Sequence, residues 1–79
     1  MIKTLQALVD SVHKAHLDEP GSPLKNASYK NGDTDVEVMA LGQNGDITIY
    51  KWVDEAKVYR CIFTGSADEA KEFIANKEW

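Results

Sequence analysis

Three predicted turns in the middle of the chain constrain its fold more than any other sequence feature. Asn31-Gly32 and Asn44-Gly45 are the dipeptide that tight β-hairpins favour most, because both central residues of a type I′ turn need positive φ. A third turn is predicted at 54–57. The segments around these turns predict an antiparallel meander of four strands, at residues 27–30, 35–41, 46–53 and 58–64.

The segments that flank the predicted sheet have the spacing of amphipathic helices. Apolar residues recur every three or four positions over 2–17, which predicts a first helix there. Residues 18–23 contain two prolines and a glycine, and they should form a loop. Ser66 and Glu69 match a capping box, which predicts the start of a second helix over 66–78.

Together these elements predict one small α+β domain over residues 1–79. Its sheet is a four-stranded antiparallel meander, with an N-terminal and a C-terminal helix packed on one face (α-β-β-β-β-α). A domain of this size buries only about 60% of the surface that its unfolded chain exposes. Cys61 is the only cysteine, so an internal disulfide is excluded. Self-association is therefore an expected source of stability.

Alternation along the strands sorts the sheet into two faces, and both look apolar. A two-residue turn at Asn44-Gly45 would pair Leu41 with Thr48, and a turn at 54–57 would pair Val53 with Val58. One face then carries mostly large side chains: Met39, Leu41, Tyr50, Trp52, Tyr59, Cys61 and Phe63. The other carries mostly β-branched side chains and two neighbouring cations: Val36, Val38, Ala40, Ile47, Ile49, Val53, Val58 and Ile62, with Lys51 and Arg60.

Two short helices can cover only one of these faces. The aromatic face is the expected core, because aromatic rings bury the most area per residue. The β-branched face would then be exposed, and an exposed apolar patch typically marks an interface. This predicts a non-enzymatic module that forms a homodimer or binds a protein partner through Val36, Val38, Ile49, Lys51, Arg60 and Ile62. The reverse assignment makes Tyr50, Trp52 and Tyr59 the binding face.

The charge balance is acidic, with a net charge of −4 and a pI near 5.0. Direct nucleic-acid binding is not expected, because it is typical of basic proteins. Asp33, Asp35 and Glu37 would form an acidic surface beside the first turn. A surface of this kind can imitate nucleic-acid phosphates. The second hypothesis is therefore a phage-type accessory inhibitor, with an anti-defence role such as anti-CRISPR, that blocks a nucleic-acid-handling complex.

The residues that carry chemistry are few. His13 and His16 stand three positions apart on the first predicted helix, so a small metal-dependent regulator is a third hypothesis. Cys61 is predicted to be a small core residue rather than a nucleophile. We expect no metal, no cofactor and no enzymatic activity. No apolar run approaches the ~20 residues of a membrane span, and one cysteine is typical of a reducing, cytoplasmic setting.

Overall fold

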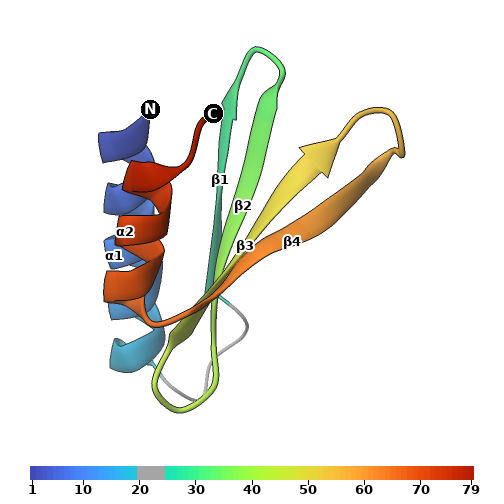
Figure 1. Cartoon of the computed structure of the whole chain (residues 1–79). Helices are drawn as coiled ribbons and strands as arrows, with labels where there is room; N and C mark the ends of the chain where they lie inside the picture. The colour runs from blue at the N-terminus through green and yellow to red at the C-terminus, as the bar shows by residue number, and fades with distance from the viewer. Residues whose placement is uncertain (20–24) are drawn as a thin grey trace.

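The computed structural model describes residues 1–19 and 25–79. The four strands form one antiparallel sheet in the order β1-β2-β3-β4, and both helices lie on the same side of it (Figure 1). The predicted α+β fold and its element order are confirmed. The elements are α1 (Ile2–Asp18), β1 (Lys25–Asn31), β2 (Thr34–Leu41), β3 (Asp46–Val53), β4 (Val58–Gly65) and α2 (Ala67–Asn76). The loop predicted over 18–23 falls mostly outside the described residues.

The predicted capping box fixes the start of α2. The Ser66 hydroxyl accepts a hydrogen bond from the Glu69 backbone N–H at 3.2 Å, and the Glu69 carboxylate accepts one from the Ser66 N–H at 3.1 Å. These two bonds satisfy amides that the first helical turn would otherwise leave unpaired. The bond from the Ser66 N–H, with a smaller contribution from the Ser66 side chain, also holds the pKa of Glu69 below its ordinary value, because it stabilises the charged carboxylate.

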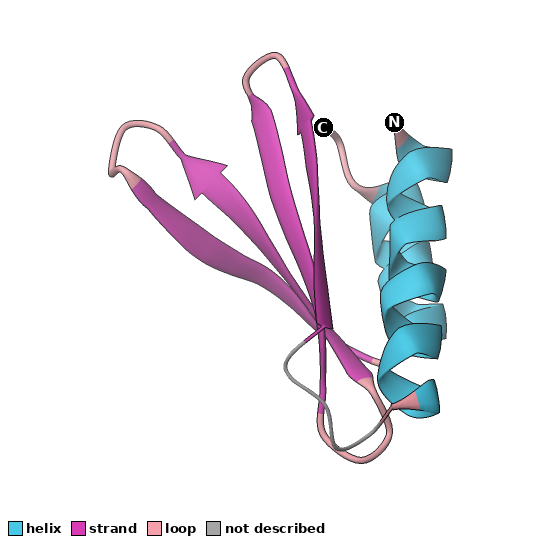
Figure 2. Cartoon of the chain, turned by 180° about the vertical axis from the view of Figure 1, so that it is seen from behind, coloured by secondary structure: helices cyan, strands magenta, loops and turns pink. Residues whose placement is uncertain are grey.

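The two helices form one layer against the sheet (Figure 2). Gln6 on α1 donates from Nε2 to the backbone oxygen of Lys71 on α2 at 3.0 Å. The Lys71 ammonium lies 2.9 Å from the Asp10 carboxylate, which adds an ion pair between the helices. These polar contacts flank the apolar stripes that face the sheet, so the helices bury their apolar residues against the strands.

The β-branched face of the sheet is the core, so the expected assignment of the two faces is wrong. Val36, Val38 and Ile49, which were predicted to be exposed, each have an exposed fraction of 0%. The aromatic face is the one that the helices leave uncovered. The buried core consists of Leu5, Val9 and Val12 from α1, Val36, Val38, Ala40, Ile47 and Ile49 from the sheet, and Ala70 and Ile74 from α2.

Charge explains why the helices cover this face. The register places Glu37 opposite Tyr50, so this carboxylate shares the aromatic face, and Asp35 lies two residues away on the same strand. Covering that face would remove these carboxylates from water, which costs several kcal/mol per unpaired ion. The cations of the β-branched face, Lys51 and Arg60, lie near the tip of the β3–β4 hairpin, which diverges from the helices (Figure 1).

The β2–β3 turn is longer than predicted. Leu41 pairs with Asp46 rather than Thr48, because the loop contains four residues, 42–45. Gly42 and Gly45 adopt φ values of +77° and +66°, and the Gly45 N–H donates to the Gly42 carbonyl at 3.3 Å. The pairing is therefore shifted by two residues. A shift of two leaves every side chain on its expected face, because strands alternate with a period of two.

The β3–β4 register is confirmed near the turn and wrong beyond it. Val53 pairs with Val58 as predicted, but a β-bulge after the Tyr50–Cys61 pair leaves Ile62 as an extra residue. Phe63 consequently pairs with Ile49 and turns toward the helices. Its ring packs 5.0 Å from that of Phe73 on α2, instead of lying on the aromatic face as expected.

Candidate functional site

The two hairpins separate at one end of the sheet. The ladder between β2 and β3 stops at Val36 and Lys51, whereas each hairpin remains paired up to its own turn. Residues 34–35 of β2 and 52–53 of β3 therefore have a strand partner on one side only. The β1–β2 and β3–β4 turns point away from each other at this end (Figure 1).

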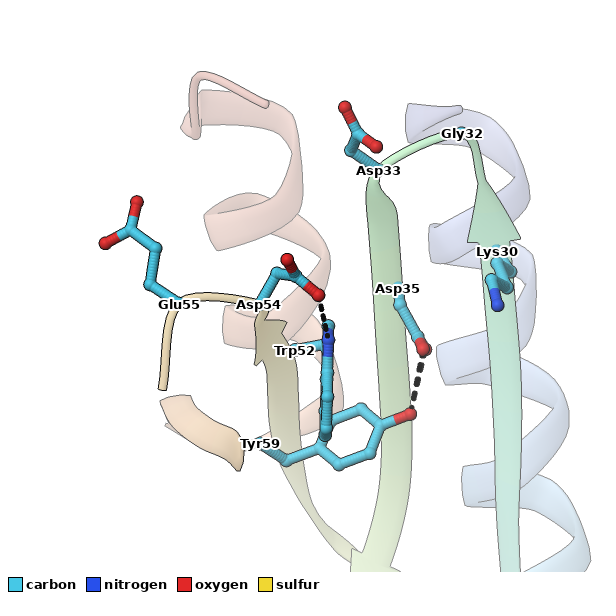
Figure 3. Close-up of a pocket in the computed structure, with 8 residues that line it drawn as sticks. All are labelled: Lys30, Gly32, Asp33, Asp35, Trp52, Asp54, Glu55 and Tyr59. Carbon is cyan, nitrogen blue, oxygen red and sulfur yellow. Dashed lines mark hydrogen bonds between the residues drawn. The ribbon is translucent and has the colours of Figure 1, made fainter. Parts of the chain in front are cut away.

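An open pocket of about 710 Å³ lies between the separated hairpins. Its walls come from the ends of all four strands and from the first and third turns (Figure 3). We call this pocket the inter-hairpin cleft; it is lined by Lys30, Gly32, Asp33, Asp35, Trp52, Asp54, Glu55 and Tyr59.

Two aromatic rings form one wall of the inter-hairpin cleft. Trp52 and Tyr59 are opposite each other on β3 and β4, and their rings make an edge-to-face contact with centroids 5.1 Å apart. The polar tip of each ring points to a carboxylate (Figure 3). Tyr59 donates to both carboxylate oxygens of Asp35 at 3.0 Å, and Trp52 Nε1 makes a long 3.5 Å contact with Asp54. These contacts restrict the rotation of both rings.

The Tyr59–Asp35 hydrogen bond joins the two hairpins across the cleft. Tyr59 lies on β4 and Asp35 on β2, so the bond reaches past β3. Donating this bond favours the protonated phenol, which raises the pKa of Tyr59; partial burial and the negative charges of Asp35 and Glu37 act in the same direction. The phenol therefore remains neutral and keeps its donor over the ordinary pH range.

The lining of the inter-hairpin cleft is strongly acidic. It contains four carboxylates and one ammonium, a net charge of −3. The Asp54 carboxylate also accepts from Lys57 at 3.0 Å, at the edge of the cleft. Within residues 1–19 and 25–79, Asp33 and Glu55 form no ion pair. The cleft therefore presents negative charge that the described part of the chain does not neutralise.

Some of these residues were predicted from the sequence. Trp52 and Tyr59 belong to the reverse assignment of the faces, and Asp33 and Asp35 belong to the predicted acidic surface. The remaining members of the two sets, Tyr50 and Glu37, lie on the same face but outside the cleft lining. Tyr50 pairs with Cys61, and Glu37 accepts from Ser28 Oγ at 2.6 Å.

Asp54 and Glu55 were missed as site residues, although a signal for them exists. In a four-stranded meander the first and third turns lie at the same end of the sheet. Acidic residues in those two turns, around Asp33 and Asp54, are therefore neighbours in space while far apart in sequence.

The predicted exposure of the β-branched face is wrong for most of its apolar residues. Val36, Val38 and Ile49 are inside the core, and Ile62 is half-buried at the β-bulge. Lys51 and Arg60 are paired across β3 and β4 as predicted. Neither has a carboxylate partner in the described part of the chain. These cations lie on the side of the hairpin opposite to the aromatic pair.

The two histidines of α1 bind the β2–β3 turn. Nδ1 of His13 lies 2.9 Å from the carbonyl oxygen of Gly45, and Nε2 of His16 lies 2.5 Å from that of Gly42. Each ring thus donates one N–H to a turn carbonyl. Among the described residues, no group of three His, Cys, Asp or Glu side chains is arranged to hold a metal ion.

Cys61 is exposed on the uncovered face rather than buried, so its prediction as a core residue is wrong. Its thiol contacts the Phe63 carbonyl at 3.6 Å and the Thr64 hydroxyl at 3.5 Å, both on its own strand.

Neither helix in the described residues is long and apolar enough to cross a bilayer. Comparisons with protein-family models, with curated proteins and with solved structures find no match to this chain.

Proposed function

We propose that this protein is a non-enzymatic interaction module that binds a protein partner in the inter-hairpin cleft. One observation carries the proposal: the sheet face that the helices leave uncovered holds an open, acidic pocket with an aromatic pair in its wall. Tryptophan and tyrosine are the residues that interfaces favour, because their rings offer large, rigid contact areas with a polar tip. Here both rings are already held by hydrogen bonds, so binding costs little side-chain entropy.

The reactive side chains support binding rather than catalysis. His13 and His16 both contact backbone carbonyls of the β2–β3 turn, and the Cys61 thiol contacts acceptors of its own strand. A nucleophile paired with a base, as covalent catalysis needs, is not among these contacts. We therefore assign His13, His16 and Cys61 structural roles, as hydrogen-bond partners of backbone carbonyls.

A second copy of the chain is the alternative occupant of the cleft. Lys51 and Arg60 lie side by side without carboxylate partners among the described residues, and they would complement the acidic lining of another molecule. Light scattering after size exclusion tests this version at increasing protein concentration. A homodimer that dissociates in Arg60→Glu supports self-association through these cations, and a monomer at all concentrations excludes it.

Affinity capture with matched variants tests the proposed function. Wild-type protein, Trp52→Leu and the control Tyr50→Leu are immobilised in parallel and exposed to lysate of the source cells. Both substitutions remove one aromatic ring from the same sheet face, but only Trp52 lines the cleft. We expect a partner that wild type and Tyr50→Leu retain and that Trp52→Leu loses. Equal retention by all three proteins would contradict binding in the cleft.

A further inference from the structure

We infer that the inter-hairpin cleft recognises an arginine or lysine side chain carried on an extended segment of its protein partner. This inference rests on the proposed function and names the chemistry of the partner. It follows from three features of the cleft: its charge, its rings and its strand edges.

The charge selects a cation. The cleft lining has a net charge of −3, and its Asp33 and Glu55 carboxylates have no ion-pair partner within the described residues. A cleft of one sign raises the local concentration of oppositely charged groups and repels like charges. A phosphate backbone is therefore disfavoured, whereas a guanidinium or ammonium group would neutralise the lining.

The rings provide a second contact for the same cation. Trp52 and Tyr59 stand in the wall between the carboxylates of Asp35 and Asp54 (Figure 3). A cation over an indole or phenol ring gains from the ring quadrupole. A carboxylate has about four acceptor sites, so Asp35 can accept from a guanidinium while it still accepts from Tyr59. The site therefore offers the ring-and-carboxylate combination that suits arginine best.

The strand edges select an extended backbone. Beyond Val36 and Lys51, the facing edges of β2 and β3 are no longer paired with each other. An extended peptide can satisfy such edges with main-chain hydrogen bonds, while its alternate side chains point to one face. A cationic residue on that face would reach the carboxylates and rings of the cleft.

Selection from a random 12-residue peptide display library on the wild-type protein tests this inference. Selected peptides are then synthesised with a fluorescent label, and their affinities are measured by anisotropy. We expect one recurring position to hold arginine or lysine. Replacing that residue by citrulline, which keeps the shape of arginine without its charge, should weaken binding about tenfold or more.

Matched protein variants locate the binding. Asp35→Asn combined with Asp54→Asn removes two charges of the cleft, and the new amide oxygen at position 35 can still accept from Tyr59. The double variant should also bind about tenfold more weakly or worse. The control Glu37→Gln removes a carboxylate of the same face outside the cleft, and it should leave the affinity unchanged.

The outcomes separate the inference from the function on which it rests. Selected peptides that lose affinity for Trp52→Leu but share no cationic position would overturn the cationic partner and leave cleft binding intact. Peptides whose affinity is the same for wild type and Trp52→Leu, or the absence of any selected peptide, would overturn both. The citrulline comparison uses wild-type protein only, so it holds even if the double variant does not fold.

Discussion

The middle of the sheet and the tip of the β3–β4 hairpin contrast sharply, although strand β3 runs through both. In the middle, Ile49 pairs with Val38, and both side chains are fully buried beneath the helices. At the tip, residues 52–59 pair only within their own hairpin, and Val58 and Tyr59 have exposed fractions of 44% and 41%. The middle holds the fold together, and the tip presents side chains to solvent.

This contrast shows how a small domain can carry aromatic residues without burying them. The polar tips of Trp52 and Tyr59 are bonded to Asp54 and Asp35. Because burying those carboxylates would cost free energy, the aromatic face stays exposed to solvent. The Val and Ile side chains of the opposite face form the core under the helices. The uncovered aromatic surface therefore lies beside negative charge.

The largest effect is expected for the two neighbours on β3 that face opposite ways. Ile49→Ala should lower the free energy of unfolding by about 2–5 kcal/mol, because it leaves a cavity in the core. Tyr50→Ala should cost about 1 kcal/mol or less, since it removes a cross-strand contact on the uncovered face. Urea unfolding followed by circular dichroism measures both. A larger loss for Tyr50→Ala would mean that the aromatic face is the core.

A medium effect is expected for the glycines of two turns at opposite ends of the sheet. Gly32 and Gly45 have φ values of +60° and +66°, so alanine is strained at both. Gly32→Ala should cost about 1 kcal/mol, because an added Cβ meets no atom within 4 Å. At Gly45 the Cβ would approach Nδ1 of His13 to 3.0 Å, so Gly45→Ala should cost about 2 kcal/mol.

Urea denaturation distinguishes these two glycine variants. Equal losses would show that α1 does not hold the β2–β3 turn through His13.

The smallest effect is expected at high pH and concerns the bond across the cleft. The pKa of Tyr59 is raised, chiefly by its hydrogen bond to Asp35, so the folded protein favours the neutral phenol. The stability from this bond is fully present below the unfolded tyrosine pKa of about 10 and is lost as pH rises through the folded pKa. Wild type should therefore exceed Tyr59→Phe in thermal stability up to about pH 10 and lose this advantage progressively as the pH rises further. A difference that stays constant through about pH 11 would contradict the account.

The sequence predicted the elements of this fold well because their signals are local. The capping box at Ser66 and the turn at 54–57 each depend on a few neighbouring residues, and both occur as expected. The loop at 42–45 and the bulge at Ile62 were missed, because both depend on contacts with other elements. The His13 and His16 rings hold the turn carbonyls, and Phe63 packs on Phe73 of α2.

The site was predicted only in part, because its residues meet through topology. A comparison of the apolar area on each face predicted that the helices cover the aromatic face. The free-energy cost of removing Asp35 and Glu37 from water outweighs that gain, so the helices cover the other face. Counting the charges on each face over all four strands would have given the correct core. Predicting that Asp33 and Asp54 line the same cleft would have required one further step, which is to place the first and third turns at the same end of the sheet.

Cys61 reports most directly on the central claim that the aromatic face is open and available for binding. This cysteine lies opposite Tyr50 in the middle of that face, and its thiol is exposed. The measurement is the rate at which a chromogenic disulfide reagent labels the native protein, compared with the rate in concentrated urea. We predict that the native protein is labelled nearly as fast as the unfolded chain. Labelling that occurs only after unfolding would place the aromatic face beneath the helices and contradict the account.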